Sequence, residues 1–314
     1  MESLASSALP DSNQNSNLAN CNSTVPATTL SGTCIGLAAI EKDNLKLYQP
    51  QYPLYSEGAS KRRWIYLPPG TKIDSTNPDE WVFPLGTILW KEFSVGNLKI
   101  ETRQLRKIKE GFGPESWEFS VYIWRSDQSD AELFNVTTDN MNMVPARFAI
   151  SQVSTTYSLI PNAACLTCHR GTKDVALGFN YLQLSDPNKN TWLKGRDSLW
   201  LTTLWLRADS IAGSALDQDT IGYLQSNCAT CHNPRGAAAN SGNFQHLSTA
   251  TTLADENIIK TAGMRAGLIV NGDPDNSNLY QRVFSGSMPS KTLLPYKTPD
   301  PAAPGKIRSW IFSL

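Results

Sequence analysis

The stretch WEFSVYIW (117–124) indicates the fold class of the first half of this 314-residue chain. In it Trp117, Phe119, Val121 and Ile123 alternate with more polar positions, and a period of two is that of a β-strand. Stretches rich in aromatic and β-branched residues precede it at 80–95 and 98–108, between Gly and Pro turn signals. We therefore predict an antiparallel β-sandwich or barrel-like domain over residues 44–160.

The rest of the chain divides around this β-rich region. Residues 1–43 are polar and read as a tail, in which Cys21 and Cys34 are either free thiols or, as we expect, a disulfide. Such a bridge closes a short loop and contributes about 3 kcal/mol in the chain-entropy model. Residues 161–212 hold a cysteine motif and a short linker helix, DSLWLTTLWLRAD (197–209). Residues 213–314 read as a helical unit, so the whole chain is predicted to be a multidomain α+β protein.

Charge and hydropathy exclude several classes of protein. The chain has 28 basic and 28 acidic residues and a formal net charge of zero, which argues against a nucleic-acid-binding surface and against a polybasic membrane tether. No apolar run approaches the roughly 20 residues that a transmembrane helix needs. The first residues also lack the basic start and apolar stretch of a secretory leader.

Two short motifs of the same form carry the chemistry: CLTCH (165–169) and CATCH (228–232). They use four of the six cysteines and two of the three histidines. C-x-x-C-H is the pattern of covalent haem c attachment, because one helical turn presents both thiols to the haem vinyl groups and places the histidine under the iron. We therefore expect two covalently bound haems. The predicted attachment residues are Cys165, Cys168, Cys228 and Cys231, and the proximal ligands are His169 and His232.

Two other uses of the motifs fit less well. A structural zinc site needs four ligands, and the remaining Cys and His residues have no ligand spacing. A thioredoxin-like site places C-x-x-C at a turn of a βαβ unit, and no such unit is visible.

The distal ligands follow from the few remaining Met and His residues. For the haem at His232 the residue is Met288, which lies 56 residues downstream beside the stiffening Pro289. For the haem at His169 no such methionine follows. Met143 is preferred there, and Met141, His246, Met264 or an open iron position are the alternatives.

At the C-terminus, GLIVNGDPDNSNLYQRVFSGSMPS (267–290) and IRSWIFSL (307–314) resemble the final part of small class I cytochromes c found in bacterial dihaem proteins. This resemblance implies a helical cytochrome c-like domain over 213–314, with Met288 in the ligand position. Arg282 matches the arginine of the pattern, where charge-assisted pairing favours contact with a haem propionate, the alternative being a solvated surface residue. The pattern's second proline is Ser290 here.

Upstream, IPNAACLTCH (160–169) and LGFNYLQL (177–184) are similar to segments of a largely uncharacterised family of secreted dihaem c-type cytochromes. The resemblance covers roughly residues 50–314. It implies an electron-transfer protein outside the cytoplasm, in the periplasm, at the cell surface or secreted, whose leader is absent from this sequence. We expect a carrier between redox partner proteins rather than an enzyme. The alternatives are a dihaem peroxidase-like enzyme with an open haem at His169, and a haem-bearing binding or filament-forming module.

Overall fold

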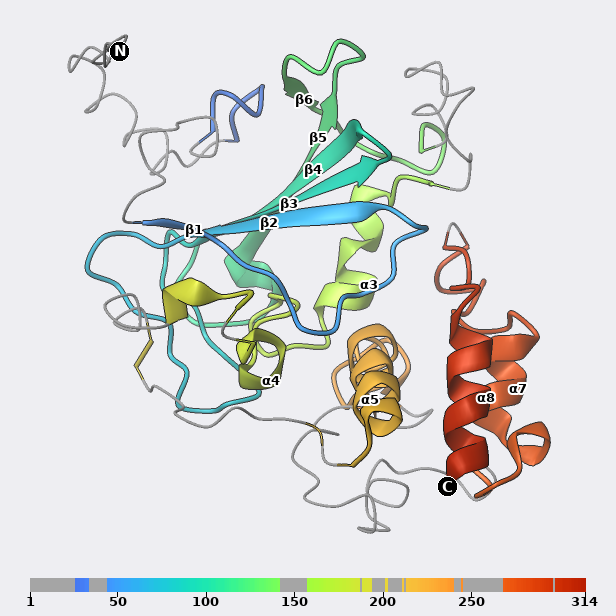
Figure 1. Cartoon of the computed structure of the whole chain (residues 1–314). Coiled ribbons are helices and arrows are strands. Elements are labelled where there is room, and N and C mark those ends of the chain that lie inside the picture. Colours follow the sequence, from blue (N-terminus) through green and yellow to red (C-terminus); the bar gives the residue numbers. More distant parts are fainter. Residues whose placement is uncertain are drawn as a thin grey trace, which may run out of the picture.

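The computed structural model describes residues 26–33, 44–141, 157–186, 188–193, 201–202, 211, 213–239, 244, 268–295 and 297–314. Its first half is a six-stranded antiparallel sheet whose strands lie side by side in sequence order (Figure 1). The strands are β1 (Leu45–Leu47), β2 (Ser60–Tyr66), β3 (Ile88–Val95), β4 (Leu98–Lys107), β5 (Trp117–Trp124) and β6 (Ala131–Leu133). The predicted strand at 117–124 is therefore confirmed as β5.

Short connections between strands explain the sequential order. Two residues join β3 to β4, and Gly96 takes a φ of 57°, which suits a glycine in such a tight hairpin. The register of this pair shifts after Phe93, which marks a bulge.

The described strands form one open sheet, and not the sandwich or barrel that the sequence predicted. The reason lies in what covers the sheet. Val175, Phe179 and Trp192, from the chain after the first motif, pack with Ile65 and Leu89 of the strands in one buried cluster. Loops and short helical turns thus take the place of a second sheet on this side, and they bring the first motif to the sheet.

The helices follow in the second half of the chain. They are α3 (Cys165–His169), α4 (Tyr181–Leu184), α5 (Ala215–Asn227), α7 (Asn278–Phe284) and α8 (Ala303–Ser313), with 3-10 turns at Pro114–Ser116, Asn162–Ala164, Thr191–Leu193 and Pro274–Asn276. The coarse α+β class is confirmed. None of the helices in the described ranges is long and apolar enough to cross a membrane.

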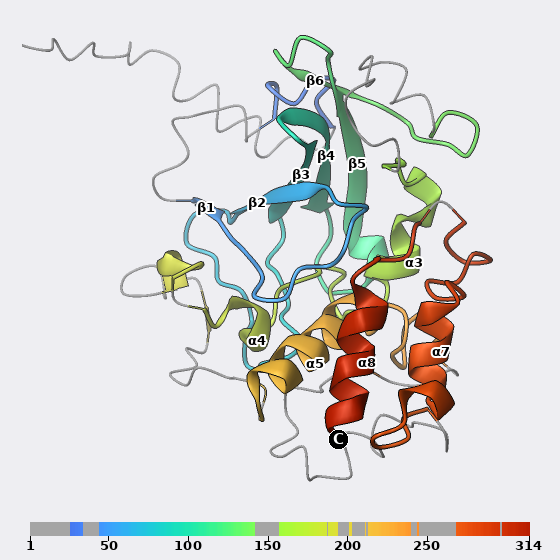
Figure 2. The same cartoon turned by 45° about the vertical axis from the view of Figure 1, so that its right-hand side comes forward.

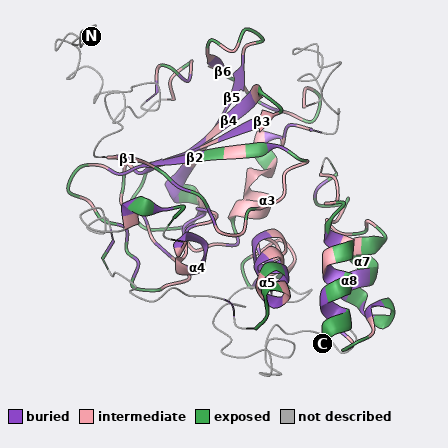
Figure 3. Ribbon diagram, viewed as in Figure 1, coloured by how far each residue is buried: buried purple, intermediate pink, exposed green. Residues whose placement is uncertain are grey.

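Helix α5 begins at a capping box and runs into the second motif, within the region predicted to be helical. The Ser214 side chain accepts the Asp217 amide, and the Asp217 carboxylate accepts the Ser214 amide in return. Helix α8 packs on α5 and α7 with one face buried and the other exposed (Figures 2 and 3). Ile221 and Leu224 of α5 meet Ile307 and Trp310 of α8 in a buried cluster.

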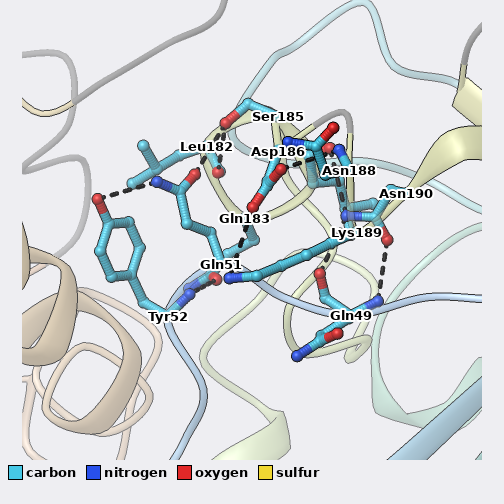
Figure 4. Close-up of polar contacts among 11 residues, drawn as sticks. Gln49, Gln51, Tyr52, Leu182, Gln183, Ser185, Asp186, Asn188, Lys189 and Asn190 are labelled. Atoms are coloured by element: carbon cyan, nitrogen blue, oxygen red, sulfur yellow. Dashed lines mark hydrogen bonds and ion pairs between the residues drawn. The ribbon is translucent and has the colours of Figure 1, made fainter.

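A chain of hydrogen bonds ties the β-rich region to α4 and α5. The backbone amides of Gln51 and Tyr52 donate to Gln183 of α4, to its carbonyl oxygen at 2.7 Å and its side-chain oxygen at 3.0 Å (Figure 4). The Gln183 amide group in turn donates to Ser226 Oγ of α5 at 2.8 Å. Nearby, Asn190 exchanges two hydrogen bonds of 2.9 Å with the backbone of Gln49. The two halves of the chain are therefore joined by buried polar contacts.

Gly222 on α5 allows the Tyr52 ring to lie directly against the helix. A Cβ at this position would be 2.5 Å from Tyr52 Cγ, far inside van der Waals contact. Gly222→Ala should therefore cost about 1–3 kcal/mol in overpacking, offset by the roughly 0.5–1 kcal/mol by which helices prefer alanine. We expect a net loss of unfolding free energy of about 1 kcal/mol in urea titrations.

Gly305 of α8 provides the matched control for this substitution. Its Cβ would meet open space, so Gly305→Ala should stabilise the chain by about 0.5–1 kcal/mol. Equal effects of the two substitutions would show that Tyr52 does not press on α5.

Some predicted features lie outside the described residues. These are the Cys21 and Cys34 pair and nearly all of the linker helix at 197–209, of which Leu201 forms an isolated bridge with Ile73.

Candidate functional site

The first motif forms α3, a single helical turn, and the ring of its histidine is hydrogen-bonded to a backbone carbonyl. His169 Nδ1 lies 2.6 Å from the backbone oxygen of Val175. A carbonyl oxygen only accepts, so Nδ1 carries the proton and Nε2 keeps its lone pair. Metal-binding histidines use this arrangement to fix the ring and its tautomer. Burial, and then the positive charge of Lys91, lowers the pKa of His169 to about 3, so the ring is neutral and suited to bind a metal.

The carbonyl that holds His169 belongs to an unusual backbone position. Val175 has a φ of 49°, which a β-branched residue rarely adopts, and its side chain is fully buried. Its neighbour Asp174 is also buried and accepts Lys107 Nζ at 2.6 Å, Trp117 Nε1 at 2.7 Å and the Phe83 amide at 2.7 Å. This network anchors the segment that orients the histidine.

A cavity that is partly open to solvent lies between the sheet and α3. Cys165, Cys168 and His169 line it on the side of α3. Its apolar wall comes from Leu54, Phe93, Leu105, Phe119, Val121, Ile160, Leu177 and Leu294, and its charged lining from Lys61, Lys91, Arg103, Lys297 and Glu57.

The chain after Met288 completes this cavity. Lys297 Nζ donates to the Tyr55 carbonyl at 3.1 Å, and the Thr298 amide donates to Glu57 Oε1 at 3.3 Å. Leu294 and Lys297 therefore close a site whose cysteines lie more than a hundred residues earlier. The first motif is built by both halves of the chain.

The second motif begins where α5 ends. Cys228 is the C-cap residue of α5, and the His232 amide donates to the Cys228 carbonyl at 2.8 Å. The His232 ring meets the buried Phe244 ring edge to face, with centroids 5.5 Å apart. The first motif has the same feature, because the His169 ring meets Phe119 at 5.4 Å. Each histidine is thus oriented by one aromatic side chain.

The two motifs touch each other. The Cys231 thiol donates a hydrogen bond to the Thr167 carbonyl at 3.7 Å. Interaction with the neighbouring Cys231 side chain, together with nearby cations, lowers the pKa of Cys168, and interaction with Cys168 raises the pKa of Cys231. Gly171 permits this approach, since a Cβ there would be 2.6 Å from the Thr230 carbonyl oxygen. Burial raises the pKa of Cys165, and that of Cys228 to about 12, so these two remain thiols.

Of the predicted distal ligands, Met288 and Met141 lie in the described part of the chain. Met288 is half-buried just after α7, and its amide donates to the Arg282 carbonyl at 3.1 Å. Arg282 is exposed, so here its backbone holds the methionine loop. Met141 packs against the cluster around Phe93 rather than lining the cavity. Met143, His246 and Met264 lie outside the described residues.

Sequence reasoning missed the residues that surround the first motif. Lys91 and Arg103 interrupt the apolar face of their strands, and that break in the alternation was a usable signal. Burial, together with Arg63 and Arg103, lowers the pKa of Lys91 to about 7. Asp174 and Val175 had no comparable signal, because their roles depend on contacts with distant strands.

In the part of the chain that the structure describes, no group of three or more His, Cys, Asp or Glu side chains forms a bare metal site. The four cysteines of the motifs are free. Comparisons with protein-family models, with curated proteins and with solved structures found no match, so what the site does must be inferred from its own residues.

Proposed function

We propose that this protein is a dihaem c-type cytochrome that transfers electrons between redox partner proteins outside the cytoplasm. One observation carries the proposal: the structure brings the two C-x-x-C-H motifs and their cysteines together, with the Cys231 thiol donating to the Thr167 carbonyl at 3.7 Å. Haems attached through these cysteines would be neighbours, and closeness of two redox centres is what electron exchange between them requires. The resemblance of 267–314 to class I cytochromes c supports the same function.

The residues around the first motif fit a haem. The cavity offers an apolar wall for the macrocycle, two thiols for its vinyl groups and cations for its carboxylates. His169 presents Nε2 as the proximal ligand, held by the Val175 carbonyl and the Phe119 ring. A bound haem supplies one-electron redox chemistry, and the chain's part is to hold it, orient it and set its potential.

For the second haem, His232 is the proposed proximal ligand and Met288 the distal one, with Arg282 near a propionate. The position of Cys228 at the end of α5 supports this assignment, since the helix delivers the motif to the cluster formed with α8. For the haem at His169, Met143 remains the proposed distal ligand.

Haem content tests the proposal. In a bacterium that attaches haem c, the chain should carry two covalent haems, measured by the mass of the intact protein and by its haem absorption. Replacing Cys228 and Cys231 by Ser, or Cys165 and Cys168 by Ser, should leave one haem per chain, because each haem loses both thioether bonds. The matched control, Cys21→Ser with Cys34→Ser, should keep both.

Two outcomes would contradict this function. If the parent chain carries no covalent haem under these conditions, the proposed function is contradicted. Rapid turnover of hydrogen peroxide by the two-haem protein would favour the peroxidase-like alternative, in which the iron at His169 keeps an open position.

A further inference from the structure

A row of positive charges crosses the sheet opposite α3. Arg63 of β2, Lys91 of β3 and Arg103 of β4 are direct cross-strand partners and therefore share one face. Like charges placed opposite each other on neighbouring strands repel and destabilise a sheet. Lys91 and Arg103 line the cavity, which indicates that they serve a ligand rather than the stability of the fold.

Basic side chains outnumber acidic ones in the lining of the cavity. Four basic side chains line it, Glu57 is the acidic one, and Arg103 also pairs with Glu101. Of the four, Lys61 bonds to Ser56 Oγ at 3.0 Å and Lys297 to the Tyr55 carbonyl. Within the described residues the Lys91 amine has no ion pair with a carboxylate. Lys91 is thus a half-buried basic side chain that lines the cavity without a carboxylate partner.

We propose that Lys91, together with Arg103 and Lys297, binds the two carboxylates of the tetrapyrrole held by Cys165 and Cys168. The inference rests on the proposed function and assigns the charged wall of that site. Haem carries two propionate groups, and basic side chains predominate among the charged residues that line the cavity. Charge-assisted hydrogen bonds from Lys and Arg are the usual partners of buried carboxylates.

The arrangement also predicts an effect on the redox potential. A nearby positive charge favours the reduced haem, which has one positive charge fewer than the oxidised haem. In the two-haem protein, Lys91→Gln should lower the equilibrium constant for reduction of one haem about tenfold. This lowers the reduction potential of that haem by about 59 mV for a one-electron couple. Lys91→Arg should keep the potential within a third of that shift, because the charge stays. The potentials are measured by spectroelectrochemical titration.

Arg62→Gln is the matched control, since it removes one positive charge from the neighbouring strand on the opposite face. Lys297→Gln, in a loop, is a second variant that does not depend on a strand residue and should shift the same potential in the same direction. Each variant is first checked for two covalent haems by mass.

Three results would overturn this inference. The first is that both potentials of Lys91→Gln and Lys297→Gln equal those of Arg62→Gln. The second is that Lys91→Gln and Lys91→Arg both convert one haem from low to high spin in electron paramagnetic resonance, which would make Lys91 an iron ligand. The third is that a small anion such as chloride restores the parent potential in Lys91→Gln, which would make the wall an anion site. All three leave two haems attached and the proposed function intact, whereas loss of covalent haem from the parent chain would contradict the proposed function itself.

Discussion

Replacing Asp174 by Asn is expected to lower the free energy of unfolding by about 3–5 kcal/mol, because Lys107 would remain as an unpaired cation in the core. Neither side chain of the Asp174–Lys107 pair is exposed. The carboxylate also accepts hydrogen bonds from Trp117 and from the Phe83 amide, so the substitution weakens three contacts together. Urea unfolding followed by tryptophan fluorescence measures the loss.

The same substitution should loosen the first motif. Asp174 precedes Val175, whose carbonyl holds His169, and a released segment would let the strained Val175 backbone relax. Hydrogen exchange of the Phe83 amide should become faster. The double variant Asp174→Asn with Lys107→Met should recover most of the stability, because it removes the unpaired cation.

A surface ion pair provides the control for Asp174. Asp275 pairs with Arg308 in an exposed position, and Asp275→Asn should leave the unfolding midpoint unchanged within error. A loss below 1 kcal/mol for Asp174→Asn would contradict our view that the buried pair anchors the segment behind His169.

Trp310→Ala is expected to cost about 3–5 kcal/mol, as truncation of a buried aromatic side chain usually does. Trp310 is 1% exposed and fills the cluster between α5 and α8. Its Nε1 donates to Asp217 Oδ1 at 3.0 Å, the carboxylate that also caps α5. The substitution therefore removes packing and one partner of the helix cap, and it should be measured by thermal and urea unfolding.

Two further variants separate these contributions. Trp310→Phe keeps most of the apolar volume and loses the hydrogen bond, so it should cost about 1–3 kcal/mol. Phe312→Ala lies on the same helix, but its side chain is 74% exposed, and the change should stay within about 0.5 kcal/mol. Similar losses for Trp310→Ala and Phe312→Ala would mean that α8 does not pack through Trp310.

The elements predicted from local patterns were found where those patterns are strong. The alternation at 117–124 became β5, and the unit predicted to be helical over 213–314 contains α5 and α8. Among the described residues one open sheet stands in place of the predicted sandwich, because alternation reports which side chains are buried, and the covering layer, here Val175, Phe179 and Trp192, has no periodic pattern.

The sequence by itself determined the two C-x-x-C-H motifs, because the spacing of two thiols and a histidine depends only on one turn of chain. Only the tertiary structure decided that the motifs meet, that Val175 holds His169, and that Lys91 and Arg103 face the cavity. Thr167 and Cys231 are 64 residues apart, and their approach depends on strand register, on α4 and on the packing of α5. Such contacts are properties of the whole fold, since each is set by elements far away in the chain.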